Sequence, residues 1–149
     1  MKPVTVSVDV PTSRGEVYEF LDVLANHEQF TDHFMVDWEL SGPRRGVGAK
    51  ANVRVKAPGE KDRTEMETVE VEPGRRIVER GTGGSREKRQ TRGTYTLEDL
   101  PGGGTRIVFR LEFLSLPTGE KLMGPLQRAY LRLVNGKALR RLAETLTSI

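Results

Sequence analysis

One change in the hydrophobic pattern constrains the fold of this chain more than any other sequence feature. Between residues 34 and 113 the apolar residues recur in short runs with a period of two, which is typical of half-buried strands. From Thr118 to the C-terminus they recur every three or four residues, as on one face of a helix. Because strands joined by short turns pair antiparallel, we expect an antiparallel sheet followed by one long helix.

The expected strands are separated by short turns rich in glycine and proline. They cover residues 4–10, 34–40, 49–57, 62–72, 75–82, 88–100 and 106–113. The alternation slips near Thr68-Val69, which predicts a β-bulge and a bend in that strand. Strongly twisted sheets of six or seven strands tend to curl, so we expect one concave apolar face.

Helices are expected after the first strand and at the C-terminus. Ser13 and Glu16 have the spacing of a capping box, and Asn26 begins a second short helix through Phe30. The long helix is expected to start with Pro125 at its first position. Because glycine costs about 1 kcal/mol in a helix interior, a break at Asn135-Gly136 into two helices is the alternative.

The length and composition exclude several classes of protein. A chain of 149 residues without a long linker fits a single domain, residues 1–149. The absence of cysteine excludes disulfides and thiolate metal sites. No apolar run approaches the ~20 residues of a membrane span, and the N-terminus lacks the apolar region of a signal peptide. We therefore expect a cytoplasmic protein with no membrane span.

Several segments resemble one known family. They are Val4–Leu21, Gly46–Lys50, Val71–Ile77, Gly93–Leu97 and Gly103–Phe109. Together with the order of elements, they resemble the START-like SRPBCC superfamily, and most closely its polyketide cyclase/dehydrase branch. The resemblance implies an α+β helix-grip fold: a curved antiparallel sheet of six to seven strands wrapped around a long C-terminal helix, with two short helices after strand 1.

The resemblance also implies a hydrophobic ligand held between helix and sheet. Small-molecule pockets are lined mostly by apolar and aromatic side chains with a few polar groups. The candidate lining residues are Trp38, Val53, Val55, Met66, Tyr95, Phe109, Leu111, Tyr130, Leu133 and Val134. The alternative is that these side chains pack as an ordinary solid core.

Charged residues on the central strands have two interpretations. Glu79, Arg80 and Arg92 are the best candidates for a charged side chain inside the cavity, where arginine could bind a carboxylate or enolate bidentately. A basic stretch runs through Arg75, Arg76, Arg80, Arg86, Lys88, Arg89 and Arg92. It lacks interleaved aromatic residues, and acids at Glu65, Glu67, Glu70 and Glu72 favour cross-strand ion pairs over nucleic-acid binding.

The only two histidines, His27 and His33, flank the expected second helix, and Asp32 adjoins His33. Histidine suits acid–base chemistry near neutral pH, but the alternative is a solvated turn residue. A metal site needs three or four ligands at compatible spacing, and no such pattern occurs. No phosphate loop or dinucleotide motif is present either. We therefore expect no metal and no cofactor.

The leading functional hypothesis is the binding of a small hydrophobic, polyketide- or lipid-like molecule, oriented by arginine or tyrosine. The first alternative is an aromatase/cyclase in which Tyr95, Tyr130, Arg80 or Arg92 stabilises an enolate. It requires a titratable group facing the cavity. The second alternative is a protein-interaction module, such as a homodimer, which predicts a solid core without an internal gap.

Overall fold

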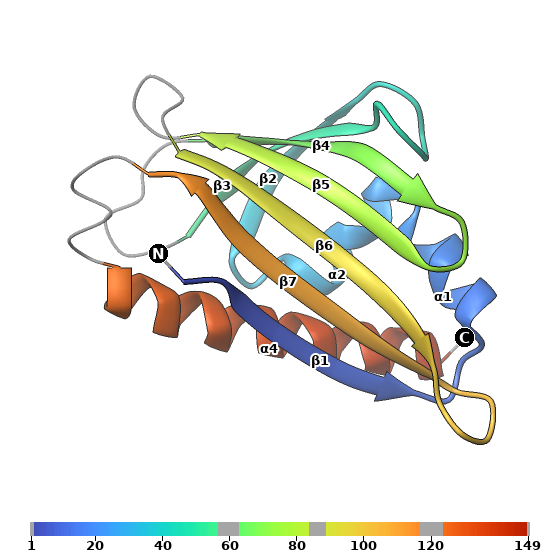
Figure 1. Ribbon diagram of the computed structural model, residues 1–149. Coiled ribbons are helices and arrows are strands. Elements are labelled where there is room, and N and C mark those ends of the chain that lie inside the picture. Colours follow the sequence, from blue (N-terminus) through green and yellow to red (C-terminus); the bar gives the residue numbers. More distant parts are fainter. Residues whose placement is uncertain (1, 57–62, 84–88, 117–123, 149) are drawn as a thin grey trace.

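The computed structural model describes residues 2–56, 63–83, 89–116 and 124–148 (Figure 1). After β1 (Val4–Val10) come three short helices: α1 (Arg14–Leu21), the 3-10 helix η1 (Leu24–His27) and α2 (Glu28–Thr31). Six strands follow: β2 (Met35–Ser41), β3 (Lys50–Val55), β4 (Arg63–Glu72), β5 (Arg76–Gly83), β6 (Arg89–Asp99) and β7 (Thr105–Ser115). The chain then forms α4 (Gly124–Thr147).

The seven strands form one antiparallel sheet in the order β1-β7-β6-β5-β4-β3-β2. Figure 1 shows α4 running along the sheet beside β1, so that the sheet curves around the helix. This is the α+β helix-grip arrangement that the family resemblance implies. Ser13 begins α1 by accepting a hydrogen bond from the Glu16 amide at 3.4 Å, as the capping box requires.

Three register shifts interrupt the strand pairing, and one of them lies between Gln90 and Thr91, where β6 pairs with β7. The register between β4 and β5 shifts between Thr68 and Glu70, which confirms the predicted bulge. A second shift, between Val36 and Glu39 on β2, was not predicted. It coincides with Asp37, whose φ of 56° lies in the left-handed region that few residues other than glycine adopt.

The long helix α4 is continuous through Gly136, so the expected alternative of two helices is wrong. A methyl group added at Gly136 would lie 4.0 Å from Val6 Cγ1, which is ordinary packing distance. The buried apolar residues of α4 are Val134, near its middle, and Ala138, Leu139, Leu142 and Leu146 in its C-terminal half. These residues pack into the main core with α1, α2 and the inner faces of β5, β6 and β7.

Hydrogen bonds and an ion pair connect α4 to the segment after α2. His33 Nε2 donates to the Val134 carbonyl at 2.8 Å, and Arg141 donates to His33 Nδ1 at 2.9 Å and pairs with Asp32 at 2.6 Å. Burial, followed by the charges of Arg141 and Lys137, lowers the pKa of His33, although its hydrogen bond to Val134 opposes that shift. His33 is therefore a structural, neutral imidazole. Within the described ranges, no helix combines the length and apolar character needed to cross a membrane.

Candidate functional site

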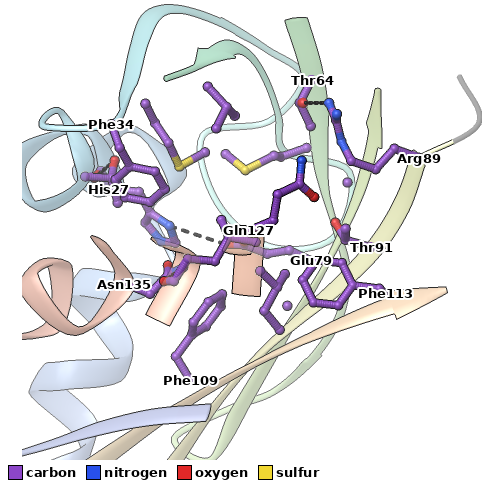
Figure 2. A pocket seen from close by; sticks show the side chains of 18 of the residues that line it. His27, Phe34, Thr64, Glu79, Arg89, Thr91, Phe109, Phe113, Gln127 and Asn135 are labelled. Carbon is purple, nitrogen blue, oxygen red and sulfur yellow. Dashed lines mark hydrogen bonds and ion pairs between the residues drawn. The ribbon is translucent and has the colours of Figure 1, made fainter. Parts of the chain in front are cut away.

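A cavity of about 140 Å³ lies between the concave face of the sheet, α2 and the N-terminal half of α4 (Figure 2). Its wall is mainly apolar. The apolar side chains that line it are Phe34, Met35, Trp38, Val55, Met66, Tyr95, Phe109, Leu111, Phe113, Leu116, Tyr130 and Leu131. The cavity therefore suits a small molecule with a large apolar surface.

The alternation of the central strands decides which side chains face the cavity. On β5 the inward residues include Glu79 and Gly81, and on β6 they include Thr91, Gly93 and Tyr95. Gly93 is paired with Glu79 across the two strands, and a Cβ atom added at Gly93 would lie 2.9 Å from Phe109 Cε1. The missing side chain thus lets the Phe109 ring pack against this part of the sheet.

The principal ionisable pair of the cavity is Glu79 and His27. His27 Nδ1 lies 3.3 Å from Glu79 Oε1, and both side chains are less than a tenth exposed. The other ring nitrogen of His27, Nε2, lies 2.7 Å from the carbonyl oxygen of Leu21. Because a carbonyl oxygen only accepts hydrogen bonds, Nε2 must carry a proton.

The surroundings of Glu79 favour its protonated form. Burial raises the pKa of Glu79, and the charge of His27 offsets only part of that rise. Burial raises the pKa of Tyr95 well above its usual value, and the nearby Glu79 carboxylate raises it further. The Tyr95 ring contacts His27 edge-on, with ring centroids 5.5 Å apart, so the three groups form one cluster.

Polar groups reach the mainly apolar cavity from several sides. Figure 2 shows His27 and Asn135 at one side and Arg89 with Thr64 at the other. Arg89 donates to Thr64 Oγ1 at 3.0 Å. Gln127 lies between these two sides, so a bound molecule would meet a few hydrogen-bonding groups within a mainly apolar wall.

Most of the predicted lining residues do line this cavity: Trp38, Val55, Met66, Tyr95, Phe109, Leu111 and Tyr130. Two of these, Trp38 and Tyr130, also find hydrogen-bond partners for their polar groups. Trp38 Nε1 donates to the Met35 carbonyl at 2.9 Å, and the Tyr130 hydroxyl donates to the Lys56 carbonyl. The indole N–H of Trp38 is therefore already engaged, whereas the Tyr130 hydroxyl donates its proton to the chain and can still accept a hydrogen bond.

Three of the apolar residues that were predicted to line the cavity lie outside it. Val53 is fully buried beside Leu24, Ala49 and Ala51 in a second small core, and Val134 belongs to the main core. Leu133 is 68% exposed. Successive helical residues turn by about 100°, so Leu133 leaves the covered face that Val134 occupies.

The prediction that Arg80 or Arg92 enters the cavity is wrong. The two residues are directly paired across β5 and β6, one position away from the inward pair Glu79 and Gly93. Side chains alternate between the faces of a strand, so both arginines lie on the outer face of the sheet, where they line a shallow depression with Arg76 and Arg110.

The outer face carries one ion pair between groups that the sequence analysis named, and a second pair with an acid that it did not name. Arg76 pairs with Glu70 at 3.1 Å, and Arg92 lies 3.9 Å from Glu112. The part of the basic stretch at residues 86–88 lies outside the described residues.

Among the residues of the cavity, His27 had the weakest signal in the sequence. A histidine beside a short helix is equally typical of a solvated turn, yet His27 is only 2% exposed. Glu79 had a clearer signal, because it shares strand parity with Ile77 and Gly81. The partnership between the two residues depends on how η1 packs against the sheet, which no local pattern reveals.

The sequence matches one family model over residues 1–147, described as polyketide cyclase/dehydrase and lipid transport. The chain belongs to this family. The family match agrees with the helix-grip fold and with a cavity that holds a ligand. The description covers both members that transport a molecule and members that transform it.

Solved structures agree with the fold. TTHA0849 from Thermus thermophilus is 20% identical with a TM-score of 0.76, covering 99% of this chain and 98% of that one. Truncated norcoclaurine synthase from Thalictrum flavum is 17% identical with a TM-score of 0.71, covering 95% and 92% of the two chains. At these identities the likeness concerns the fold alone. No curated protein matches the sequence.

Proposed function

We propose that this member of the family binds a small hydrophobic, polyketide- or lipid-like molecule in the cavity between the sheet and α4. The observation that carries the proposal is the open, mainly apolar space enclosed by Trp38, Met66, Phe109 and Leu111. Removing apolar surface from water contributes about 25 cal/mol per Å² before the costs of association. A ligand that fills this space gains most of its affinity from that burial.

The polar groups would orient the ligand within the apolar space. Glu79 and His27 offer hydrogen bonds at one place, and Arg89 and Thr64 offer them at another. The orienting groups proposed here therefore replace the arginines that the sequence favoured, Arg80 and Arg92.

Native mass spectrometry of protein purified from cells is the first experiment. A retained small molecule of low polarity supports the proposal, and its mass indicates the chemical class. As an independent probe, the neutral fluorophore N-phenyl-1-naphthylamine is expected to bind with a rise in fluorescence, because its environment becomes apolar.

Filling the cavity is expected to weaken this binding. Leu111→Trp places an indole into the space, and we expect an affinity for the fluorophore at least tenfold lower, or about 1.4 kcal/mol. Arg110→Trp introduces the same side chain one residue away on the outer face and is the matched control. Equal affinity in the two variants, both folded by circular dichroism, would place the binding site elsewhere.

The cavity bears differently on the two alternative hypotheses, the interaction module and the aromatase/cyclase. An interaction module predicts a solid interior, and the cavity argues against it. The aromatase/cyclase alternative requires a titratable group facing the cavity, and Glu79 meets that requirement. A single domain, a cytoplasmic location, the absence of nucleic acid as a partner and a homodimer remain predictions from the sequence.

A further inference from the structure

The carboxyl group of Glu79 is unusually poor in partners for a buried acid. The side chain is 9% exposed, and Oε1 makes no hydrogen bond of good geometry with the described part of the chain. Buried carboxylates normally satisfy both oxygens, because an unpaired buried polar atom is costly. Glu79 also lines the cavity, so a bound molecule can approach it.

His27 is held in one orientation beside this carboxyl group. Its Nε2–H donates to Leu21, while the backbone carbonyl of His27 accepts from the Thr31 hydroxyl at 2.7 Å. Its Nδ1 faces Glu79 Oε1. When the two groups bear no net charge together, they share one proton, which lies on either Nδ1 or Oε1. The pair can therefore accept or release a proton at the cavity wall.

Other reaction classes lack the groups that they need at this place. The chain has no cysteine, and no cluster of three metal-ligating side chains occurs within the described ranges. The Thr31 hydroxyl is engaged with the backbone of His27 rather than with a base. What the cavity does provide is an acid–base group in apolar surroundings, the arrangement that tunes carboxyl groups for proton transfer.

We propose that Glu79, positioned by His27, transfers a proton to and from the α-carbon of an apolar carbonyl compound bound in the cavity. This inference rests on the proposed binding function. A carbon next to a carbonyl group is the class of apolar proton donor that gains most from an enzymatic base, because hydroxyl protons exchange with water unaided.

The reaction balances without a co-reactant. When the shared proton lies on His27 Nδ1, the Glu79 carboxylate takes the α-proton, the C–H electron pair forms a carbon–carbon double bond, and the carbonyl π pair moves to the oxygen. The product is an enolate, with Glu79 now a carboxylic acid. Return of a proton from Glu79 to the same carbon restores the ketone. In D2O the transferred proton exchanges with solvent, so the ketone becomes deuterated.

Tyr95 suits the oxygen of that enolate. Its hydroxyl makes no hydrogen bond with any described residue, and its raised pKa keeps the phenol protonated. A neutral donor facing a developing oxyanion stabilises the transition state more than the ground state. Tyr95 is only 5% exposed and adjoins both His27 and Phe109, whose rings hold it in place.

The test uses 2-tetralone, a small aromatic ketone, with the full chain in D2O. Proton NMR follows the loss of the α-proton signals, and the single tryptophan, Trp38, reports binding through its fluorescence because it lines the cavity. We expect the wild-type protein to accelerate exchange over buffer. Glu79→Gln is expected to lose about 100-fold of that acceleration, and Tyr95→Phe about tenfold or more.

The control for Glu79→Gln is Glu112→Gln, which removes a carboxylate from the outer face of β7 and should exchange like wild type. If 2-tetralone binds and the wild-type rate equals the buffer rate, the inference is overturned and the binding function stands. The inference is likewise overturned, and the binding function likewise stands, if folded Glu79→Gln exchanges the α-protons as fast as wild type. If N-phenyl-1-naphthylamine binds and 2-tetralone does not, the carbonyl class is wrong. If neither binds, both proposals fail.

Discussion

Replacing His27 with leucine is expected to lower the free energy of unfolding at pH 8 by about 3 kcal/mol. The substitution leaves the Glu79 carboxyl group buried without the imidazole that faces it, and it removes the donor to the Leu21 carbonyl. Removing one member of a buried pair is more damaging than removing both, because the remaining charge has neither water nor a counter-ion. Urea unfolding followed by circular dichroism measures the change.

The loss is expected to depend on pH in a defined direction. Burial raises the pKa of Glu79 above its ordinary value of 4.5, and His27 is the group that lowers it. A raised pKa in the folded state favours the protonated form. The contribution of Glu79 to the free energy of unfolding is therefore fully present below pH 4.5. It is lost as the pH rises through the pKa that Glu79 has in the folded state. The difference between His27→Leu and wild type should be small at about pH 4.5 and largest at about pH 8.

Glu79→Gln separates this electrostatic effect from a loss of packing. The amide is close to the carboxyl group in shape, can donate to His27 Nδ1 and carries no charge, so the single variant should be at least as stable as wild type at pH 8. In the double variant His27→Leu/Glu79→Gln the pH dependence should disappear. If the loss in His27→Leu is the same at both pH values and persists in the double variant, packing alone explains it.

Local periodicity was sufficient to predict the strands and helices, and the family resemblance supplied the helix-grip arrangement in which they pack. The seven strands, the bulge near Thr68 and the capped helix at Ser13 follow from patterns that extend over a few residues, because each depends on backbone geometry and a local apolar face. The irregularity at Asp37 has no such signal. It lies near the start of β2, next to Trp38, which lines the cavity.

The candidate site was predicted less well than the fold, for a related reason. A strand pattern shows which residues share a face, but a shift of one position moves a side chain to the other face. Arg80 and Glu79 are neighbours in sequence. Glu79 shares its face of the strand with Ile77, but its contact with His27 depends on the packing of η1 against the sheet. Gly81 and Gly93 carry no side-chain signal, although their positions help to shape the cavity wall.

The two halves of α4 contribute to different parts of the protein. The N-terminal half contributes Gln127, Tyr130 and Leu131 to the cavity wall. The C-terminal half fills the core and anchors the helix, with Leu142 fully buried. Stability and ligand binding should therefore be separable by substitutions on this one helix.

Leu142→Ala is accordingly expected to lower the free energy of unfolding by about 3 kcal/mol, because it removes buried methyl groups and leaves a cavity that the surrounding core fills only in part. Leu133→Ala, the same substitution at a position that is 68% exposed, should change stability by less than about 0.5 kcal/mol. Urea unfolding gives both values, and N-phenyl-1-naphthylamine titration at low temperature should give unchanged affinity for both folded proteins. Equal destabilisation by the two variants would mean that Leu133 is covered in solution, as its sequence-based assignment to the cavity requires. A selective loss of affinity in Leu142→Ala would mean that the anchor and the cavity wall move together.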